Sequence, residues 1–356
     1  MNHTPPSSYL SRCRLLVLLA VLHVYLSSSA LAETFFDTRY QYYQEDNGRV
    51  RVDSDYSLFS IDLSDTLMLD GTLLYSAITG ASPTGLPPDK RGGQVPLVFL
   101  EDERYAATLG LTKQLGKHSL KIGGSYSYES DYLSLGTSVQ DTISLNEKNT
   151  ELVLGFAYTH DTVGANGSDL SARKQSFDWM IGVNQLLGPN TLLTLNAGIG
   201  YKRGYLSDPY KRVLIDGEVF DEERPHRKLE QILFGQVTHF IEPWDASVEF
   251  SYRFGHNDHG INSHTTMLAF YKYFFDKRLV IRPSFRYYRQ SEADYYDTEF
   301  SGYPNFYSSD YRVSAEESFN LGLQVRWFVV PDKFSIDLGY ERYISRGTDG
   351  RTSQSA

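Results

Sequence analysis

The stretch HSLKIGGSYSYESDY, residues 118–132, alternates between apolar and polar side chains. One set comprises Leu120, Ile122, Gly124, Tyr126 and Tyr128, and the other Ser119, Lys121, Gly123, Ser125, Ser127 and Glu129. Because successive side chains of a β-strand point to opposite faces, this pattern predicts a strand with one apolar and one polar face. The apolar face could pack in the core of a soluble protein. It could instead contact lipid while the polar face lines a water-filled lumen.

The same two-residue period recurs along the chain, whereas helical periodicity is hard to find after the N-terminal region. It is clearest in RYAATLGLTKQL (104–115), ELVLGFAYTH (151–160), LLTLNAGIGYK (192–202), ASVEFSYRF (246–254) and SFNLGLQVRW (318–327). The chain is therefore predicted to be all-β.

About fifteen strands are predicted, and the connections between them alternate in length. The strands fall near 35–45, 50–63, 66–78, 103–115, 118–130, 133–145, 149–161, 174–187, 191–206, 227–241, 245–256, 263–275, 278–291, 313–329 and 333–345. Turns of two or three residues alternate with mostly longer connections such as 79–102, 207–226 and 292–312. Short turns at one rim and long loops at the other are typical of an antiparallel transmembrane β-barrel of the outer membrane. A soluble sandwich has no reason to show this bias.

The strand count leaves alternatives open. A chain that starts in the periplasm and makes fifteen strands ends outside, but bacterial single-chain barrels have even strand numbers. The final SRGTDGRTSQSA (345–356) is polar and unlike a closing strand. Either the count is wrong, or a sixteenth closing strand is missing at this C-terminus, or the first segment is a periplasmic tail and the barrel has fourteen strands. The expected division is a barrel over 33–346 and a polar tail over 347–356.

The N-terminus predicts export. Arg12 and Arg14 precede the apolar run LLVLLAVLHVYL (15–26), and Ala30 and Ala32 follow at the spacing of a signal-peptidase site, so residues 1–32 are predicted to be a signal peptide. Cys13, the single cysteine, lies inside that segment. Removing the two arginines changes the formal charge from −10 to −12, and an acidic exported chain is a poor candidate for binding nucleic acid. The expected partners are outer-membrane lipid and the barrel-assembly machinery.

The sequence offers little sign of catalysis. It contains no phosphate-binding glycine loop, paired-cysteine metal site or nucleophile elbow, so neither an enzyme nor a cofactor is expected. His160 and His239 could serve a serine hydrolase, but serine is common on lumen faces without any catalytic role. In GHNDHGINSH (255–264), the residues His256, Asp258, His259 and His264 could bind a metal ion, although a solvated hairpin loop is the favoured interpretation.

A set of charged residues falls on the polar sides of neighbouring strands. The set consists of Arg253, Arg282, Arg286, Arg326, Glu249, Asp337 and Glu341. Charged rings inside a pore select among ions, whereas paired charges would plug or stiffen a filled barrel, and both readings stay open. The acidic, tyrosine-rich stretch 291–311 could constrict such a pore, face a ligand or form an exposed loop.

Six stretches resemble one protein family in their order and spacing. They are GASPTG (80–85), SYSYESDYLSLG (125–136), RGYLSDPYKRV (203–213), RYYRQSEADYY (286–296), SSDYRVS (308–314) and LGYERY (338–343). The resemblance is to an uncharacterised Gram-negative outer-membrane β-barrel family classed as a domain of unknown function. It implies a barrel in the outer membrane, no established activity, and a link to envelope redox or metal chemistry.

Two functions are therefore expected, in order of preference. The first is a porin-like channel for small polar solutes or ions. The second is a non-conducting outer-membrane scaffold for a redox or metal-handling assembly at the surface or in the periplasm, with a periplasmic lipoprotein or redox protein as partner.

Overall fold

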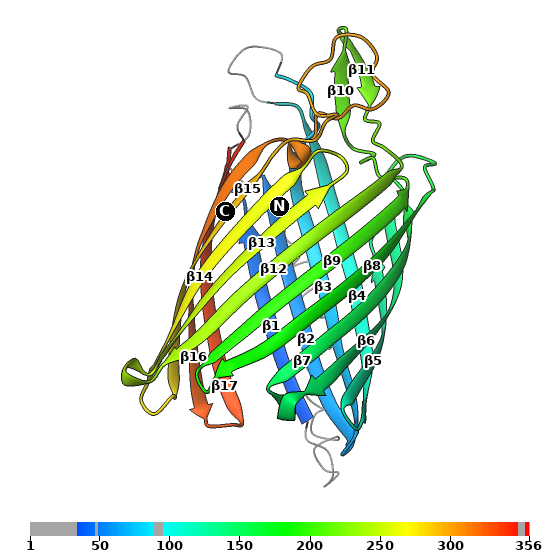
Figure 1. The fold of residues 1–356 in the computed structure, drawn as a ribbon. Coiled ribbons are helices and arrows are strands. Elements are labelled where there is room, and N and C mark those ends of the chain that lie inside the picture. Colours follow the sequence, from blue (N-terminus) through cyan, green and yellow to red (C-terminus); the bar gives the residue numbers. More distant parts are fainter. Residues whose placement is uncertain (1–33, 47–48, 89–94, 348–352, 356) are drawn as a thin grey trace, which may run out of the picture.

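One antiparallel sheet makes up nearly the whole structure, a computed structural model that describes residues 34–46, 49–88, 95–347 and 353–355. Its sixteen strands follow one another in chain order, interrupted only by a two-stranded hairpin, β10–β11. Figure 1 shows the strands tilted and curled round a common axis into a barrel, with the hairpin standing above one rim. The predicted all-β transmembrane barrel is thus confirmed.

The observed strands lie close to the predicted ones. Those of the sheet are β1 (Thr34–Gln44), β2 (Val50–Ser64), β3 (Leu67–Pro83), β4 (Leu97–Leu115), β5 (His118–Tyr128), β6 (Tyr132–Leu145), β7 (Thr150–Val163), β8 (Ala172–Gly188), β9 (Thr191–Gly204), β12 (Arg227–Ile241), β13 (Ala246–Asn257), β14 (Asn262–Phe274), β15 (Leu279–Gln290), β16 (Glu316–Val330), β17 (Phe334–Gly347) and β18 (Ser353–Ser355). The hairpin strands are β10 (Arg212–Ile215) and β11 (Glu218–Asp221). Single 3-10 turns are η2 (Asn146–Lys148), η3 (Glu242–Trp244) and η4 (Tyr311–Val313). In the described part of the chain, no helix has the length and apolarity needed to cross a membrane.

The barrel is built inside out relative to a soluble protein. Large apolar side chains are exposed on the outer face of the sheet, among them Leu109, Ile122, Leu195, Phe250, Leu268, Leu321 and Trp327. The opposite face carries polar and charged groups, and there the buried hydroxyls of Ser54 and Ser76 lie 2.8 Å apart. Lipid can cover an apolar outer face, and water or paired polar groups can occupy the inner one. The apolar side chains of residues 118–132 thus lie on the outer face, which lipid can cover.

The two rims differ as the sequence predicts. Short turns join β2 to β3, β4 to β5, β6 to β7, β8 to β9, β12 to β13, β14 to β15 and β16 to β17, and we call this end the short-turn rim. The connections at the other end are longer on average, and we call it the long-loop rim. Two of the short turns hold three consecutive non-glycine residues with positive φ, at 146–148 and 275–277.

The edges of the sheet are β1 and the end of the chain. β1 pairs with β2 along its whole length, so the fourteen-strand alternative is wrong. At the other edge, β18 pairs with β17 at Ile344–Arg346. Near the long-loop rim, Arg342 Nη2 of β17 lies 3.3 Å from Asp46 Oδ2, just after β1, which brings the two long edge strands together there. The observed count of fifteen long strands plus β18 agrees with the predicted fifteen to sixteen. The signal peptide lies outside the described residues, as does most of the predicted tail.

A folded cap over the long-loop rim is the main feature that the sequence did not predict. The hairpin β10–β11 turns at Asp216 and Gly217, both with positive φ, as a tight two-residue hairpin requires. Ile215 forms a bridge to Phe300, and Glu223 forms another to Tyr307, so the 291–315 connection packs against the hairpin. Figure 1 shows this connection wrapping the hairpin above the rim. We call residues 205–226 together with 291–315 the cap.

Candidate functional site

The inner wall formed by β13 to β17 holds all seven charged residues that periodicity assigned to the lumen. Strand pairing aligns Glu249 of β13, through β14, β15 and β16, with Glu341 of β17 on one face. Arg326 pairs in register with Val280 and Asp337, and Arg282 pairs with Gln324. Residues one position away on each strand, such as Phe250 and Leu321, are the exposed apolar ones. The seven therefore share the face opposite the apolar surface.

Most of the arginines on this wall are not neutralised. Arg326 Nε donates to Asp337 Oδ1 at 2.6 Å, and this is the one ion pair that the set of seven forms with residues that the structure describes. In the described part of the chain, no carboxylate oxygen lies within 4.0 Å of the guanidinium nitrogens of Arg253, Arg282 or Arg286. Arg286 instead lies over the ring of Tyr288, with 5.6 Å between Cζ and the ring centroid.

The wall formed by β3 to β12 has the opposite character. Lysines of its inner face reach carboxylates: Lys121 to Asp70 at 2.7 Å, Lys174 to Asp161 at 3.1 Å and Lys202 to Glu230 at 2.6 Å. Pairing of this kind stiffens a barrel and cancels its field, as the filled-barrel alternative requires. Among the described residues, the lumen is thus asymmetric, with paired cations on one wall and three arginines without an ion pair on the other.

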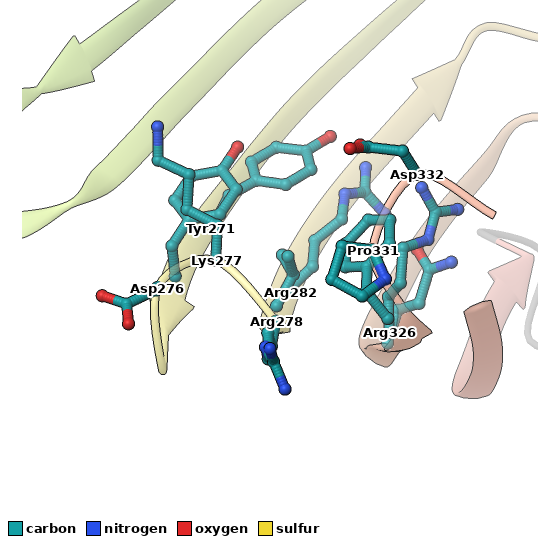
Figure 2. Close-up of a pocket in the computed structure, with 12 residues that line it drawn as sticks. Tyr271, Asp276, Lys277, Arg278, Arg282, Arg326, Pro331 and Asp332 are labelled. Atoms are coloured by element: carbon teal, nitrogen blue, oxygen red, sulfur yellow. The ribbon is translucent and has the colours of Figure 1, made fainter. Parts of the chain in front are cut away.

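A cavity of about 860 Å³ lies at the short-turn rim of the arginine-rich wall. Its lining comes from β14, β15 and β16 and from the turns that follow β14 and β16, and it includes Tyr271, Lys277, Arg282 and Arg326. In Figure 2, Arg282 and Arg326 extend toward the same side of the cavity, whereas Arg278 points away from them. We call this cavity the basic mouth.

Aromatic rings position the cations of the basic mouth. Arg282 Cζ lies 5.1 Å from the ring centroid of Tyr271, and Arg326 Cζ lies 6.0 Å from that of Phe328. Lys277 Nζ lies 5.9 Å from the ring centroid of Phe240. A cation over an aromatic face is attracted by the ring quadrupole while its edge stays open to other partners. The arrangement therefore orders these side chains without neutralising their charge.

The four histidine-loop residues do not come together as one metal site. His264 is on the outer face, with Nδ1 2.7 Å from the Tyr252 hydroxyl, and His256 Nδ1 lies 2.9 Å from Asn262 Oδ1. His259 is buried, and its ring nitrogens lie 3.1 Å from the Tyr295 hydroxyl and 2.8 Å from the Arg227 carbonyl oxygen. Asp258 Oδ1 accepts the backbone N–H of Leu229. These contacts give the loop a structural role, which ties it to the cap and to β12.

The remaining candidates are equally dispersed. His160 pairs in register with Leu135, and His239 with Val248, which places both on the outer face of the barrel. Within the described ranges, the acidic residues whose oxygens all lie within 4.8 Å of one another are Asp102, Glu129 and Asp131. Two of these carboxylates already have partners. Arg104 Nε lies 3.6 Å from Glu129, and the Tyr210 hydroxyl donates to Asp131.

The cap contains a buried ion-pair network that sequence periodicity could not reveal. Asp310 is fully buried and accepts from Arg224 Nη2 at 2.6 Å and from Arg312 Nε at 2.8 Å. Glu222 pairs with Arg224 Nε at 2.8 Å and accepts from the Ser308 hydroxyl. Burial alone would raise the pKa of the Asp310 carboxyl, but Arg312, Lys211 and Arg224 outweigh burial and lower that pKa to about 2.

Lys211 ties the cap to the barrel. Only 2% of this residue is exposed, and its Nζ donates to the carbonyl oxygen of Pro83 at the end of β3. Burial lowers the pKa of the Lys211 ammonium, against the opposing attraction of Asp310. The connection 291–311 is accordingly part of a folded unit. A second cavity, of about 570 Å³, lies within it beside Asp294, Glu299 and Tyr303.

Comparison with known proteins gives one family and a group of distant structures. A family model described as "Protein of unknown function (DUF3570)" matches residues 13–354. No curated protein matches the sequence.

Among solved structures, the siderophore receptor PirA from Pseudomonas aeruginosa is 12% identical over 88% of this chain and 55% of its own, with a TM-score of 0.48. The alcaligin outer-membrane receptor FauA from Bordetella pertussis is 14% identical over 90% of this chain and 57% of its own, with a TM-score of 0.44. A loop L8 deletion mutant of OmpT, an outer membrane protein of Vibrio cholerae, is 11% identical over 91% of this chain and 97% of its own, with a TM-score of 0.45. The chain spans about half the length of the receptors.

Proposed function

The chain belongs to the DUF3570 family of proteins of unknown function, and we propose that it forms an outer-membrane channel for small polar solutes or ions. The short-turn rim would face the periplasm and the cap the outside. This orientation follows the usual arrangement of bacterial barrels, whose short turns are periplasmic and whose long loops are extracellular.

The outer surface supports the location. Exposed leucine, isoleucine and phenylalanine side chains cover the middle of the strands, and Tyr126, Tyr128 and Tyr340 are exposed among them. Such a surface would aggregate in water but is stable against hydrocarbon, with aromatic rings favoured at the lipid boundary. Each inward arginine would cost about 2–4 kcal/mol if it faced lipid at mid-membrane instead, which favours the same orientation of the strands.

The unpaired arginines of the β13–β17 wall are the observation that carries the channel proposal. A charge that serves only to hold a filled barrel together needs a partner, as the lysines of the other wall have. Arg253, Arg282 and Arg286 lack one among the described residues, and the tyrosine rings beside Arg282 and Arg286 do not cancel their charge, so these charges remain to act on a passing solute. Basic side chains that line a pore favour anions.

Conductance in planar lipid bilayers tests the proposal. The purified wild-type protein should open discrete channels, and Arg286→Glu combined with Arg326→Glu should shift the reversal potential toward cations. Arg289→Glu is a matched control, because Arg289 lies on the same strand but on the opposite face, 65% exposed. It should leave the selectivity unchanged.

The alternatives give different results. A folded, inserted protein that never conducts would contradict the channel and favour the non-conducting scaffold, with the cap or the periplasmic turns as the contact surface. A double variant that fails to insert would show that these arginines are structural. Neither function is enzymatic.

A further inference from the structure

The basic mouth has more positive charge than the protein itself balances. Its lining contains Lys277, Arg278, Arg282 and Arg326 against the carboxylates of Asp276 and Asp332. In Figure 2, Asp276 and Arg278 both point away from Arg282. Arg326 alone of the four cations has an ion pair among the described residues, with Asp337. The Nε of Arg282 is buried without a hydrogen-bond partner in the same part of the chain.

The turn between β14 and β15 holds Lys277 at the edge of this cavity. Phe275, Asp276 and Lys277 have φ values of 52°, 53° and 66°, and the Arg278 N–H closes the turn on the Phe275 carbonyl oxygen at 3.1 Å. This tight left-handed turn fixes where the lysine side chain leaves the backbone. Lys277 thus approaches from the rim, whereas Arg282 and Arg326 approach from the strands.

We propose that the basic mouth binds a small organic anion through its carboxylate or phosphate groups. Arginine guanidinium groups offer planar pairs of N–H donors that match an oxyanion, and a lysine ammonium adds a compact point charge. Tyr271, Tyr273 and Phe328 line the same space and would pack against the apolar part of such a molecule. A cavity of about 860 Å³ is in the range that accommodates a small-molecule ligand.

The proposal names a solute class for the proposed channel and so rests on the channel function. Anion binding can nevertheless be tested separately from conduction. Titration calorimetry on the full-length protein, folded in detergent at low salt, measures binding without conduction. Sodium citrate is the carboxylate probe and inorganic pyrophosphate the phosphate probe. Saturable binding of either probe, weakened by added salt, is expected, and the stronger one identifies the preferred group.

Variants locate the site. Arg282→Gln should weaken binding of the preferred probe about tenfold, since one charge-assisted contact is lost. Lys277→Gln is a second variant, on an exposed turn that can change without disturbing the strands. Lys148→Gln is the matched control, because residues 146–148 repeat the positive-φ turn of 275–277 at the same rim. Its affinity should match that of the wild type.

Three outcomes overturn the proposal: no saturable binding to the wild type, equal weakening by Lys148→Gln, or unchanged binding in both Arg282→Gln and Lys277→Gln. Site-specific binding by a protein that does not conduct supports the anion site and contradicts the channel. Conduction without binding supports the channel and overturns the anion site.

Discussion

The cap and the basic mouth both gather arginine and lysine residues, yet they treat these charges in opposite ways. In the cap, Arg224 and Arg312 each contact two carboxylates, and Asp310 at the centre is fully buried. In the basic mouth, Lys277 and Arg282 have no carboxylate within 4.0 Å in the described residues. A charge removed from water must be paired, whereas a charge that faces the lumen can remain solvated. Cap charges are therefore structural, and mouth charges are available to a ligand.

This difference predicts which charges the fold depends on. In the cap, the fully buried carboxylate of Asp310 is shared by Arg224, which is itself mostly buried, and by Arg312, which is half exposed. In the mouth, Arg282 already lacks an ion-pair partner among the described residues, whereas Arg326 has Asp337. Four changes test this contrast, from the largest expected effect to the smallest.

The largest effect is expected from Asp310→Asn. The substitution keeps the shape of the side chain but leaves Arg224 and Arg312 without their shared carboxylate. Breaking a buried pair in this way costs about 3–5 kcal/mol, so the cap should open and become sensitive to protease while the barrel keeps its heat-modifiable mobility. Asp221→Asn is the control, because Asp221 is 81% exposed and its pair with Arg212 is worth at most about 1 kcal/mol. If the cap were equally resistant to protease in both variants, a structural role for the buried ion-pair network would be contradicted.

A smaller effect is expected from acid. The pKa of Asp310 is lowered to about 2 in the folded cap, below its ordinary value near 3.8. A lowered folded-state pKa stabilises the fold above the ordinary value, and that stabilisation is lost as the pH falls from about 4 to about 2. The loss amounts to roughly 2 kcal/mol. Pepsin cleavage of the cap should rise in this window in the wild type relative to Asp310→Asn at the same pH. A parallel pH profile in both proteins would show that another group controls acid opening.

Gly217→Val should cost the cap about 1–2 kcal/mol, since a β-branched residue is strained at positive φ. Gly217 has a φ of +86° and open space where a side chain would start, so the strain comes from the backbone alone. Gly124 on the outer face also has open space but no positive φ, and Gly124→Val is therefore the control. Both variants are compared with the wild type by the rate of proteolysis of the cap and by the melting temperature of the barrel. If Gly217→Val leaves the cap fully protected, the hairpin turn does not organise it.

The smallest effect is expected from Arg282→Gln on stability. Since Arg282 has no ion pair in the described structure, its removal should change the free energy of unfolding by less than about 1 kcal/mol. The temperature at which the folded form disappears from heat-modifiable gels measures this. A loss as large as that of Asp310→Asn would mean that the guanidinium holds the wall together and is not free for an anion.

The sequence by itself determined the barrel and the side to which its strand residues point. Alternation is a local property of extended backbone, so Phe250 and Arg253 could be assigned to opposite faces without knowledge of their neighbours. Strand ends were predicted within a few residues for the same reason, because turn chemistry is local too. The sequence did not predict the hairpin β10–β11, whose strands have four residues each. It also missed the ends of β3 and β4 at the long-loop rim, where both strands are longer than predicted.

Only the tertiary structure decided which charges find partners. Lys121 meets Asp70 across 51 residues of chain, and Arg224 meets Asp310 across 86, whereas Arg282 meets no carboxylate in the described residues. Whether two charges meet depends on the register of strands and on how loops fold over the rim, neither of which the two-residue period encodes. The stretches 80–85, 203–213 and 308–314 likewise come together only in and beneath the cap, where Lys211 reaches Pro83 and Arg312 reaches Asp208. Long-range contacts of this kind thus separate a structural charge network from a candidate binding site.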